Sequence, residues 1–526
     1  MQSQGPEGTP SAPWSCSVVV APTGLHGANG MQFGPGGLLY IASSFANKVN
    51  ILNPRTGAIA AAPEGPRATR GPDDVAFSAS GDMFITEPLA SRVSVKHANG
   101  PVETVSDSLP AANGLAVYHD RLFISECRLD GRVLEQPIEG GEPRVLAERL
   151  PFPNAMAFGP DGMLYFPVAG RRAVWRVNPD GDPRPEEFLA DAGRPSSVKF
   201  DWNGDLIYTD SLSGNVVRAS VRTRERSNVA ELSPGLDNTA VIGHHIYVSN
   251  FLHSSIHRVS EHGAQALVKN GLVGPYGMAV LPSGEVAIAD GLALALLRGG
   301  EVVHAANWHT RKYPGFLRSV VARPSGGIFA ATSAGSVVEF DWNAGETRVI
   351  ASGLNEVMGM VLHPDGTLIV AETGAGRVLA VQPRTAAVEV VAAELLRPTD
   401  VAVLPNGRVA SCESARGTVT ELGSGATVAR AEEPHSIAAL PDGLAITDAA
   451  SRRLLFKPYG SADVQVIASS LPIRSVAAAE EIPGNEVVPG PLPGFADLEL
   501  HADGSLLLGG NADGSVLKFQ RPEPSR

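Results

Sequence analysis

The chain has 526 residues, too many for one ordinary hydrophobic core, so two or more domains are expected. Its 43% hydrophobic residues are typical of a globular protein, and its 57 glycines and 41 prolines indicate many turns. The formal net charge of -13 argues against a general nucleic-acid-binding protein, which would carry a basic face, and suits a neutral or cationic ligand or a metal ion.

The N-terminal segment, residues 1–15, reads MQSQGPEGTPSAPWS and is expected to be disordered. It lacks the charged-then-apolar order of a signal peptide, and no apolar run in the chain approaches the roughly 20 residues of a membrane span. The three cysteines are far apart and form neither a disulfide framework nor a zinc-spaced cluster. We therefore expect a cytoplasmic protein that binds neither membranes nor nucleic acid. The sequence leaves its oligomeric state open.

One phrase recurs along nearly the whole chain, in twelve copies. The first four read GANGMQFGPGGLLYIASS, GPDDVAFSASGDMFITE, PAANGLAVYHDRLFISE and PFPNAMAFGPDGMLYFPV. Each copy combines an apolar strand, a turn and a second strand, and two alternating polar–apolar strands follow. Four strands in a period of about 40 residues are typical of a β-propeller blade. The sequence therefore predicts an all-β protein of two six-bladed propellers in tandem, with seven plus five blades as the alternative division.

The strand order suggests where the rings begin. Residues 15–22, SCSVVVAP, resemble an outer strand placed before the first full repeat, and residues 265–271, QALVKNG, would have the same role in a second ring. This order predicts a first propeller over 16–263 and a second over 264–521, followed by a tail at 522–526. The long loop at 472–494 is interpreted equally as a lid, a domain contact or a disordered segment.

In a propeller, the first residues of the inner strands converge at the mouth of the central channel. In the first ring these positions are predicted to hold Asn29, Asp73, Asn113, Asn154, Ser196 and Asn238. In the second ring they are predicted to hold Tyr276, Arg318, Met358, Thr399, His435 and Ala496. Carboxylate and amide oxygens suit a hard cation, Ca²⁺ above all and Mg²⁺ as the alternative, so Asn29, Asp73, Asn113, Asn154 and Asn238 are the predicted metal ligands. The competing interpretation is that these side chains cap turns.

PNAMAFGPDGMLYF, ANGLAVYHDRLFIS and PDDVAFSASGDMFITE look like blades of the gluconolactonase, regucalcin and luciferin-regenerating enzyme superfamily. They are also similar to NHL-repeat propellers and streptogramin lyases, and the resemblance covers roughly residues 24–521. It implies an axial calcium ion, with Asn113 and Asn154 matching the successive Asn pair of the family and Asp73 resembling the Asp of its Pro-Asp-Gly motif. Ser196 stands where the family has Asp, and Asn29 where it has Glu, which predicts a metal-binding relative with changed chemistry.

Candidate catalytic groups follow for each ring. In the first, Asp73 or His26 would activate water or remove a proton, since His26 lies three residues before Asn29 on a loop expected to overlook the mouth. A solvent-facing structural role for His26 is the alternative. In the second, Tyr276 and His435 would supply acid and base, Arg318 would hold an anion and Glu356 would orient either.

The sequence thus predicts a metal-dependent small-molecule enzyme, either a lactonase-like hydrolase or a lyase. Two alternatives remain open. One is a metal-independent lyase, isomerase or cyclase that uses the channel of the second ring, and the other is a propeller scaffold that binds a partner without catalysis.

Overall fold

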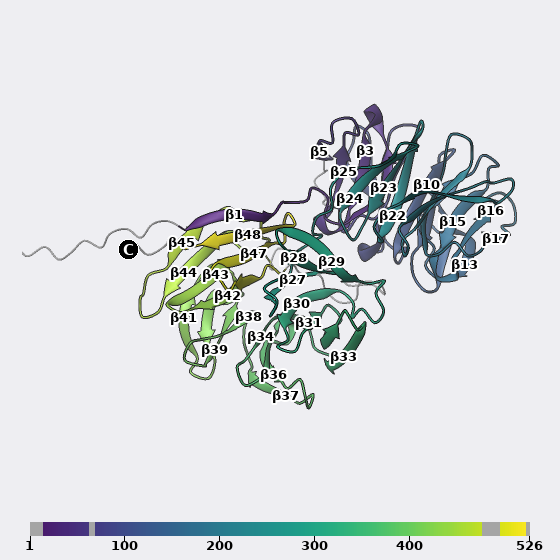
Figure 1. Cartoon of the computed structure of the whole chain (residues 1–526). Coiled ribbons are helices and arrows are strands. Elements are labelled where there is room, and N and C mark those ends of the chain that lie inside the picture. Colours follow the sequence, from purple (N-terminus) through teal and green to yellow (C-terminus); the bar gives the residue numbers. More distant parts are fainter. Residues whose placement is uncertain (1–13, 63–68, 476–494, 522–526) are drawn as a thin grey trace, which may run out of the picture. The chain divides into compact units, whose positions relative to one another are not determined.

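Twelve four-stranded antiparallel sheets form the described part of the chain (Figure 1). The computed structural model describes residues 14–62, 69–475 and 495–521. The predictions for residues 1–13, for the tail at 522–526 and for most of the loop at 472–494 lie outside these ranges. By its internal contacts the chain divides into two compact units. We call residues 23–273 the first propeller, and the described residues of 14–22, 274–475 and 495–521 the second propeller.

The first propeller contains six sheets, each built from four strands that follow one another in the chain. Its inner strands are β2 (Ala28–Phe33), β6 (Val75–Phe77), β10 (Ala112–Tyr118), β14 (Ala157–Phe158), β18 (Pro195–Phe200) and β22 (Leu236–Ile242). Its second strands are β3 (Leu39–Ser43), β7 (Met83–Glu87), β11 (Arg121–Glu126), β15 (Leu164–Val168), β19 (Leu206–Asp210) and β23 (His245–Asn250). Its third and outer strands are β4 (Lys48–Leu52), β5 (Ile59–Ala61), β8 (Arg92–Lys96), β9 (Val102–Ser106), β12 (Gly131–Gln136), β13 (Arg144–Leu150), β16 (Ala173–Val177), β17 (Glu186–Leu189), β20 (Asn215–Ala219), β21 (Arg226–Glu231), β24 (Ser255–Ser260) and β25 (Gly263–Val268). Each inner strand lies against the next, and β22 lies against β2, so the ring is closed.

The second propeller has the same plan. Its inner strands are β26 (Met278–Val280), β30 (Leu317–Ala322), β34 (Val357–Leu362), β38 (Pro398–Val403), β42 (Pro434–Leu440) and β46 (Leu498–Leu500). Its second strands are β27 (Val286–Asp290), β31 (Ile328–Thr332), β35 (Leu368–Glu372), β39 (Val409–Glu413), β43 (Gly443–Asp448) and β47 (Leu506–Gly510). Its third and outer strands are β28 (Ala293–Arg298), β29 (Glu301–Asn307), β32 (Val337–Asp341), β33 (Glu346–Ala351), β36 (Arg377–Val381), β37 (Val388–Ala392), β40 (Thr418–Glu421), β41 (Ala426–Arg430), β44 (Arg453–Pro458), β45 (Gln465–Ala468), β48 (Ser515–Gln520) and β1 (Ser15–Val20). This ring closes where β46 lies against β26.

The strand β1 completes the last sheet of the second propeller, because it pairs antiparallel with β48, with Ser15 opposite Gln520 (Figure 1). The sequence-based assignment of residues 16–22 to the first ring, and of residues 265–271 to the opening of the second, is therefore wrong. The strand β25 instead pairs with β24 through a short hairpin in which Ser260 lies opposite Gly263. Closing so short a loop costs little entropy, so the sixth sheet is complete without β1.

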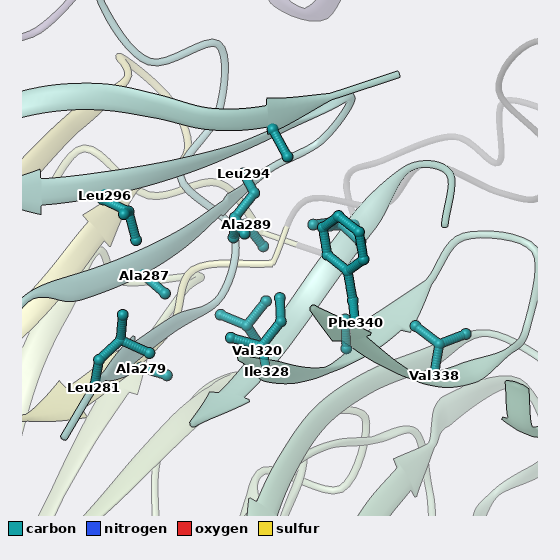
Figure 2. Packing of buried hydrophobic residues seen from close by; sticks show 13 residues of the cluster. Ala279, Leu281, Ala287, Ala289, Leu294, Leu296, Val320, Ile328, Val338 and Phe340 are labelled. Carbon is teal, nitrogen blue, oxygen red and sulfur yellow. The ribbon is translucent and has the colours of Figure 1, made fainter. Parts of the chain in front are cut away.

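Apolar side chains from neighbouring sheets interlock to form the core of each ring. In Figure 2, Ala279, Ala287 and Ala289 of the first sheet of the second propeller face Val320, Ile328 and Phe340 of the next sheet. Small residues on one sheet leave room for large ones on the other, and this gives dense packing. The inner and second strands are mostly buried, while the outer strands are mostly exposed.

Helix is almost absent from the described residues, which contain only five three-residue 3-10 turns: Pro35–Gly37, Ser44–Ala46, Pro88–Ala90, Ala169–Arg171 and Thr373–Ala375. None of the helical segments in residues 14–62, 69–475 and 495–521 is long and apolar enough to cross a membrane.

Candidate functional site

The mouth of the first channel lies where the inner strands of the first propeller begin. Asn29 lies in β2 and Asn113 in β10, while Asp73 and Asn154 lie just before β6 and β14. Asn29 Nδ2 donates to Asp73 Oδ2 at 2.9 Å and to Ser44 Oγ at 2.7 Å. These bonds join the first two blades and fix the carboxylate of Asp73 at the mouth.

The sixth residue of this row is Asp237, and not Asn238 as the sequence analysis assumed. In three blades, a hydroxyl of the second strand donates to the carbonyl of the equivalent mouth residue in the following blade. The bonds run from Thr86 to Asn113 at 2.5 Å, from Ser125 to Asn154 at 3.2 Å and from Thr209 to Asp237 at 3.2 Å. Asp237 and Asn238 are adjacent and both polar, so the sequence alone does not show which of them belongs to the row, and the hydrogen bond from Thr209 identifies Asp237.

Asn238 belongs to the next layer of the channel, together with Asp74. Its Nδ2 lies 3.4 Å from Asp74 Oδ1, and the other carboxylate oxygen of Asp74 accepts from the backbone of Leu115 at 3.0 Å. Gly30 lies between these groups, and a Cβ atom there would come within 2.5 Å of the Asp73 carbonyl oxygen. The second layer is thus a set of satisfied polar groups that supports the mouth.

Asp73 and Asp237 place two carboxyl groups at the mouth. Burial raises the pKa of Asp73 well above its usual range, the charges of Asp237 and Asp74 raise it further, and the hydrogen bond from Asn29 partly offsets this. Burial, followed by the charge of Asp74, raises the pKa of Asp237 to about 8. Carboxylates that are buried beside other carboxylates are stabilised when they bind either a proton or a cation.

The remaining oxygens of the mouth fit a hard cation. Asn113 Oδ1 is buried and accepts no hydrogen bond from any described residue. Asn154 Oδ1 accepts from the backbone of Ala155 at 2.7 Å, as in a turn cap, and retains a second lone pair. No three or more His, Cys, Asp or Glu side chains are grouped to hold a metal within residues 14–62, 69–475 and 495–521. A cation here would need the amide oxygens beside the two carboxylates, which is an arrangement that Ca²⁺ accepts.

Ser196 occupies the fifth position of the row but is engaged between blades. Its hydroxyl lies 3.0 Å from the Leu236 carbonyl oxygen and 2.9 Å from Thr209 Oγ1. At the opposite end of the inner strands the channel widens into a cavity of about 410 Å³, where the Lys199 ammonium donates to the Met156 carbonyl at 3.3 Å. Burial lowers the pKa of Lys199, and the charge of Asp74 partly restores it. A cation is therefore better accommodated at the mouth than at this end.

His26 lies in the interior and not on a loop over the mouth. Its side chain is only 3% exposed, and Nδ1 lies 2.9 Å from the carbonyl oxygen of Val273. A carbonyl can only accept, so the ring proton resides on Nδ1. The bond connects the beginning of the first propeller to its end, which gives His26 an anchoring role.

Most of the polar residues that end the second strands form hydrogen bonds to the loops before the inner strands. Glu87 accepts from the backbone of Arg70 at 2.6 Å, and Asp210 accepts from the backbone of Arg194 at 2.9 Å. Asn250 donates to the carbonyl oxygens of Ser233 and Pro234 at 3.0 Å each. Glu126 is the exception, since it accepts hydrogen bonds from the side chains of Arg128 and Arg132.

The mouth of the second channel carries different chemistry. Tyr276, Arg318 and His435 are buried there, with Met358, Thr399 and Ala496 completing the row. His435 Nε2 accepts from the backbone of Ala496 at 3.0 Å. Glu356 precedes β34, and its Oε1 accepts from Arg397 Nη2 at 3.1 Å. The four residues predicted from the sequence therefore lie around one mouth.

Three carboxyl groups line the deeper part of the second channel, which the sequence analysis did not single out. Asp400, Asp497 and Glu499 border a cavity of about 310 Å³. Ser436 Oγ lies 2.7 Å from Asp400 and 3.3 Å from Asp497. Burial raises the pKa of Asp400 and of Glu499 to about 8, and of Asp497 to about 6. Asp400 and Asp497 repeat the position of Asp74 in the first ring, since the next backbone N–H donates to the side chain of each, while Glu499 lies two residues further along its inner strand.

No family model matches the sequence, and no curated protein is significantly similar to it. Several solved propeller structures are similar in fold. Virginiamycin B lyase from Staphylococcus aureus is 16% identical, covering 53% of this chain and 96% of its own, with a TM-score of 0.39. A gluconolactonase from Xanthomonas campestris is 15% identical, covering 47% of this chain and 89% of its own, with a TM-score of 0.40. Regucalcin from Agrobacterium tumefaciens, a calcium-binding protein, is 18% identical, covering 45% of this chain and 85% of its own, with a TM-score of 0.37. At this identity the likeness is one of fold.

Proposed function

We propose that the protein is a small-molecule enzyme, a lactonase-like hydrolase or a lyase, whose first propeller holds a divalent cation, Ca²⁺, at the channel mouth. The observation that carries the proposal is the meeting of Asp73 and Asp237 at one mouth, where the charge of Asp237 raises the pKa of Asp73. Asn113 Oδ1, a buried oxygen to which no described residue donates a hydrogen bond, supports it.

Asp73, Asp237, Asn113 and Asn154 would hold the ion, with Asn29 orienting Asp73 through its 2.9 Å hydrogen bond. A bound divalent cation would polarise a substrate carbonyl as a Lewis acid. Asp73 would take the proton from water in lactone opening, or from carbon in an elimination. A carboxylate whose pKa is raised toward neutral is a better base than an ordinary one, provided that it is deprotonated at the working pH.

A screen of aldonolactone hydrolysis by the full chain, in Ca²⁺ or in chelator, tests this proposal. We expect turnover that the chelator abolishes, and a loss of about 10²-fold or more in Asp73→Asn because the base is removed. Asp107→Asn, at an exposed carboxylate outside the mouth, is the matched control and should retain full activity. Equal turnover with and without chelator would show that the reaction does not need calcium, and full activity in Asp73→Asn would show that Asp73 is not the base. An inactive but calcium-binding protein would point to the lyase alternative, tested in the same way with elimination substrates.

A second candidate is metal-independent lyase, isomerase or cyclase chemistry in the second propeller, through Tyr276, Arg318, His435 and Glu356. Burial lowers the pKa of His435 to about 4, and burial also raises the pKa of Tyr276. Both side chains are therefore neutral near pH 7, and neither is poised to exchange a proton there. This favours binding over proton transfer at the second mouth.

A further inference from the structure

Arg318 is a buried cation without a hydrogen-bonding partner in the described part of the chain. Its side chain is 1% exposed, and none of its three guanidinium nitrogens bonds to any residue that the structure describes. Burial lowers the pKa of Arg318 to about 10, so the group remains charged at neutral pH. An unpaired buried charge is costly, and proteins normally pair or hydrogen bond such groups.

The neighbouring carboxylate does not satisfy Arg318. Glu356 acts on it electrostatically, but Glu356 Oε1 accepts a hydrogen bond from Arg397 Nη2 at 3.1 Å. Arg474 brings a further positive charge near Tyr276. Asp290 also acts on Tyr276, yet neither Asp290 nor Glu356 forms a hydrogen bond with the guanidinium of Arg318.

Two neutral donors lie in the same row as Arg318. His435 is 0% exposed, and because its Nε2 accepts from Ala496, its proton lies on Nδ1, which has no acceptor among the described residues. Tyr276 keeps its hydroxyl proton, since burial raises its pKa. Phe316 and Phe495 add apolar faces, with ring centroids 5.4 Å from those of Tyr276 and His435 respectively.

We propose that the mouth of the second propeller binds the carboxylate of a small organic molecule, with Arg318 as its counter-charge and with Tyr276 and His435 as further donors. A planar carboxylate matches the two parallel N–H groups of a guanidinium, and a single negative charge matches a single unpaired cation. The aromatic neighbours suit an organic body on the ligand. This site is separate from the cation site of the first propeller and does not depend on it.

Thermal unfolding of the full chain tests the proposal, with chelator present so that calcium binding does not contribute. Wild type and Arg318→Met are compared in sodium chloride, acetate, phenylacetate and phosphate at equal ionic strength, with phenylacetamide as the uncharged analogue. Arg453→Met, at an exposed arginine of the same propeller, is the control variant.

We expect acetate, and phenylacetate more strongly, to raise the melting temperature of wild type and of Arg453→Met relative to chloride, and to leave Arg318→Met unchanged. In chloride alone, Arg318→Met should melt higher than wild type, because it removes an uncompensated buried charge. Identical carboxylate shifts in wild type and Arg318→Met, or no shift in either, would overturn the site. Stabilisation by phosphate alone would overturn its assignment to carboxylates, and a lower melting temperature of Arg318→Met without any carboxylate response would show a structural guanidinium.

Discussion

Gly30 has no side chain, and this leaves space for the backbone of Asp73 and Asp74, which belong to the two polar layers of the first channel. An added Cβ would lie 2.5 Å from the Asp73 carbonyl oxygen and 2.6 Å from Asp74 Cα, and both are backbone atoms that cannot rotate away. We expect Gly30→Ala to destabilise the protein by about 1–3 kcal/mol through overpacking, and to weaken calcium binding by displacing Asp73. Denaturant unfolding and a calcium titration measure the two effects.

Gly100 provides the matched control for this substitution. A Cβ atom there meets only the side chain of His97, which is partly exposed and can shift. Gly100→Ala should leave both stability and calcium affinity close to those of wild type. If Gly30→Ala behaves in the same way, the close packing of the two layers is not what positions Asp73.

Single residues also show which features could be predicted from the sequence and which could not. Tyr276, Arg318 and His435 were placed at one mouth because each stands at the start of the inner strand of its repeat. Asp237 was missed because Asn238 beside it is also polar, and only the hydrogen bond from Thr209 in the preceding blade distinguishes the two. The burial of His26 could not be predicted, since it depends on the Val273 carbonyl 247 positions away.

The strand β1 closes the second propeller from the other end of the chain. Its pairing with β48 supplies the outer strand of the last sheet, although only Val20 of β1 is buried. Deletion of residues 1–20 should therefore lower the unfolding temperature of the second propeller by a few degrees and leave the first unchanged. Hydrogen exchange resolved by segment measures this, with protection lost in β48 and β47 but retained in β24 and β25. Equal loss in both propellers would contradict this assignment.

The sequence correctly predicted the four-stranded blades, but it did not predict which strand completes the last sheet of each ring. Alternation of polar and apolar residues identifies a strand and its buried face. It does not identify the neighbouring strand, and both 15–22 and 265–271 have the pattern of an outer strand. The short hairpin between β24 and β25 decides which segment completes the sixth sheet. Closing this short loop costs less entropy than pairing β1, from the distant chain end, with the same sheet.

Buried carboxyl groups make the stability of the whole molecule depend on pH. Asp400 and Glu499, with pKa values of about 8 in the folded protein, titrate near 4 in an unfolded chain. The folded state then binds more protons than the unfolded state between these values, so the stability they confer is complete below about pH 4 and is lost as pH rises toward 8. We expect the free energy of unfolding of the metal-free protein to fall between pH 5 and 8, by up to about 1.4 kcal/mol per pH unit for each such group.

Glu499→Gln isolates one of these groups. The backbone amide of Val280 donates to Glu499 Oε1 at 3.0 Å, and glutamine keeps this acceptor. The variant should unfold with a shallower pH dependence than wild type over the same range, as measured by denaturant titrations at several pH values. An unchanged slope would mean that Glu499 is already ionised in the folded protein.

The two carboxylates at the mouth of the first propeller are expected to bind Ca²⁺, and calorimetric titration of the metal-free full chain with Ca²⁺ tests this most directly. We predict one calcium ion per chain, with affinity reduced by at least about tenfold in Asp237→Asn because the site loses one of its two charges. Asp107→Asn should bind as wild type does. No calcium binding by wild type, or unaltered binding by Asp237→Asn, would contradict the account.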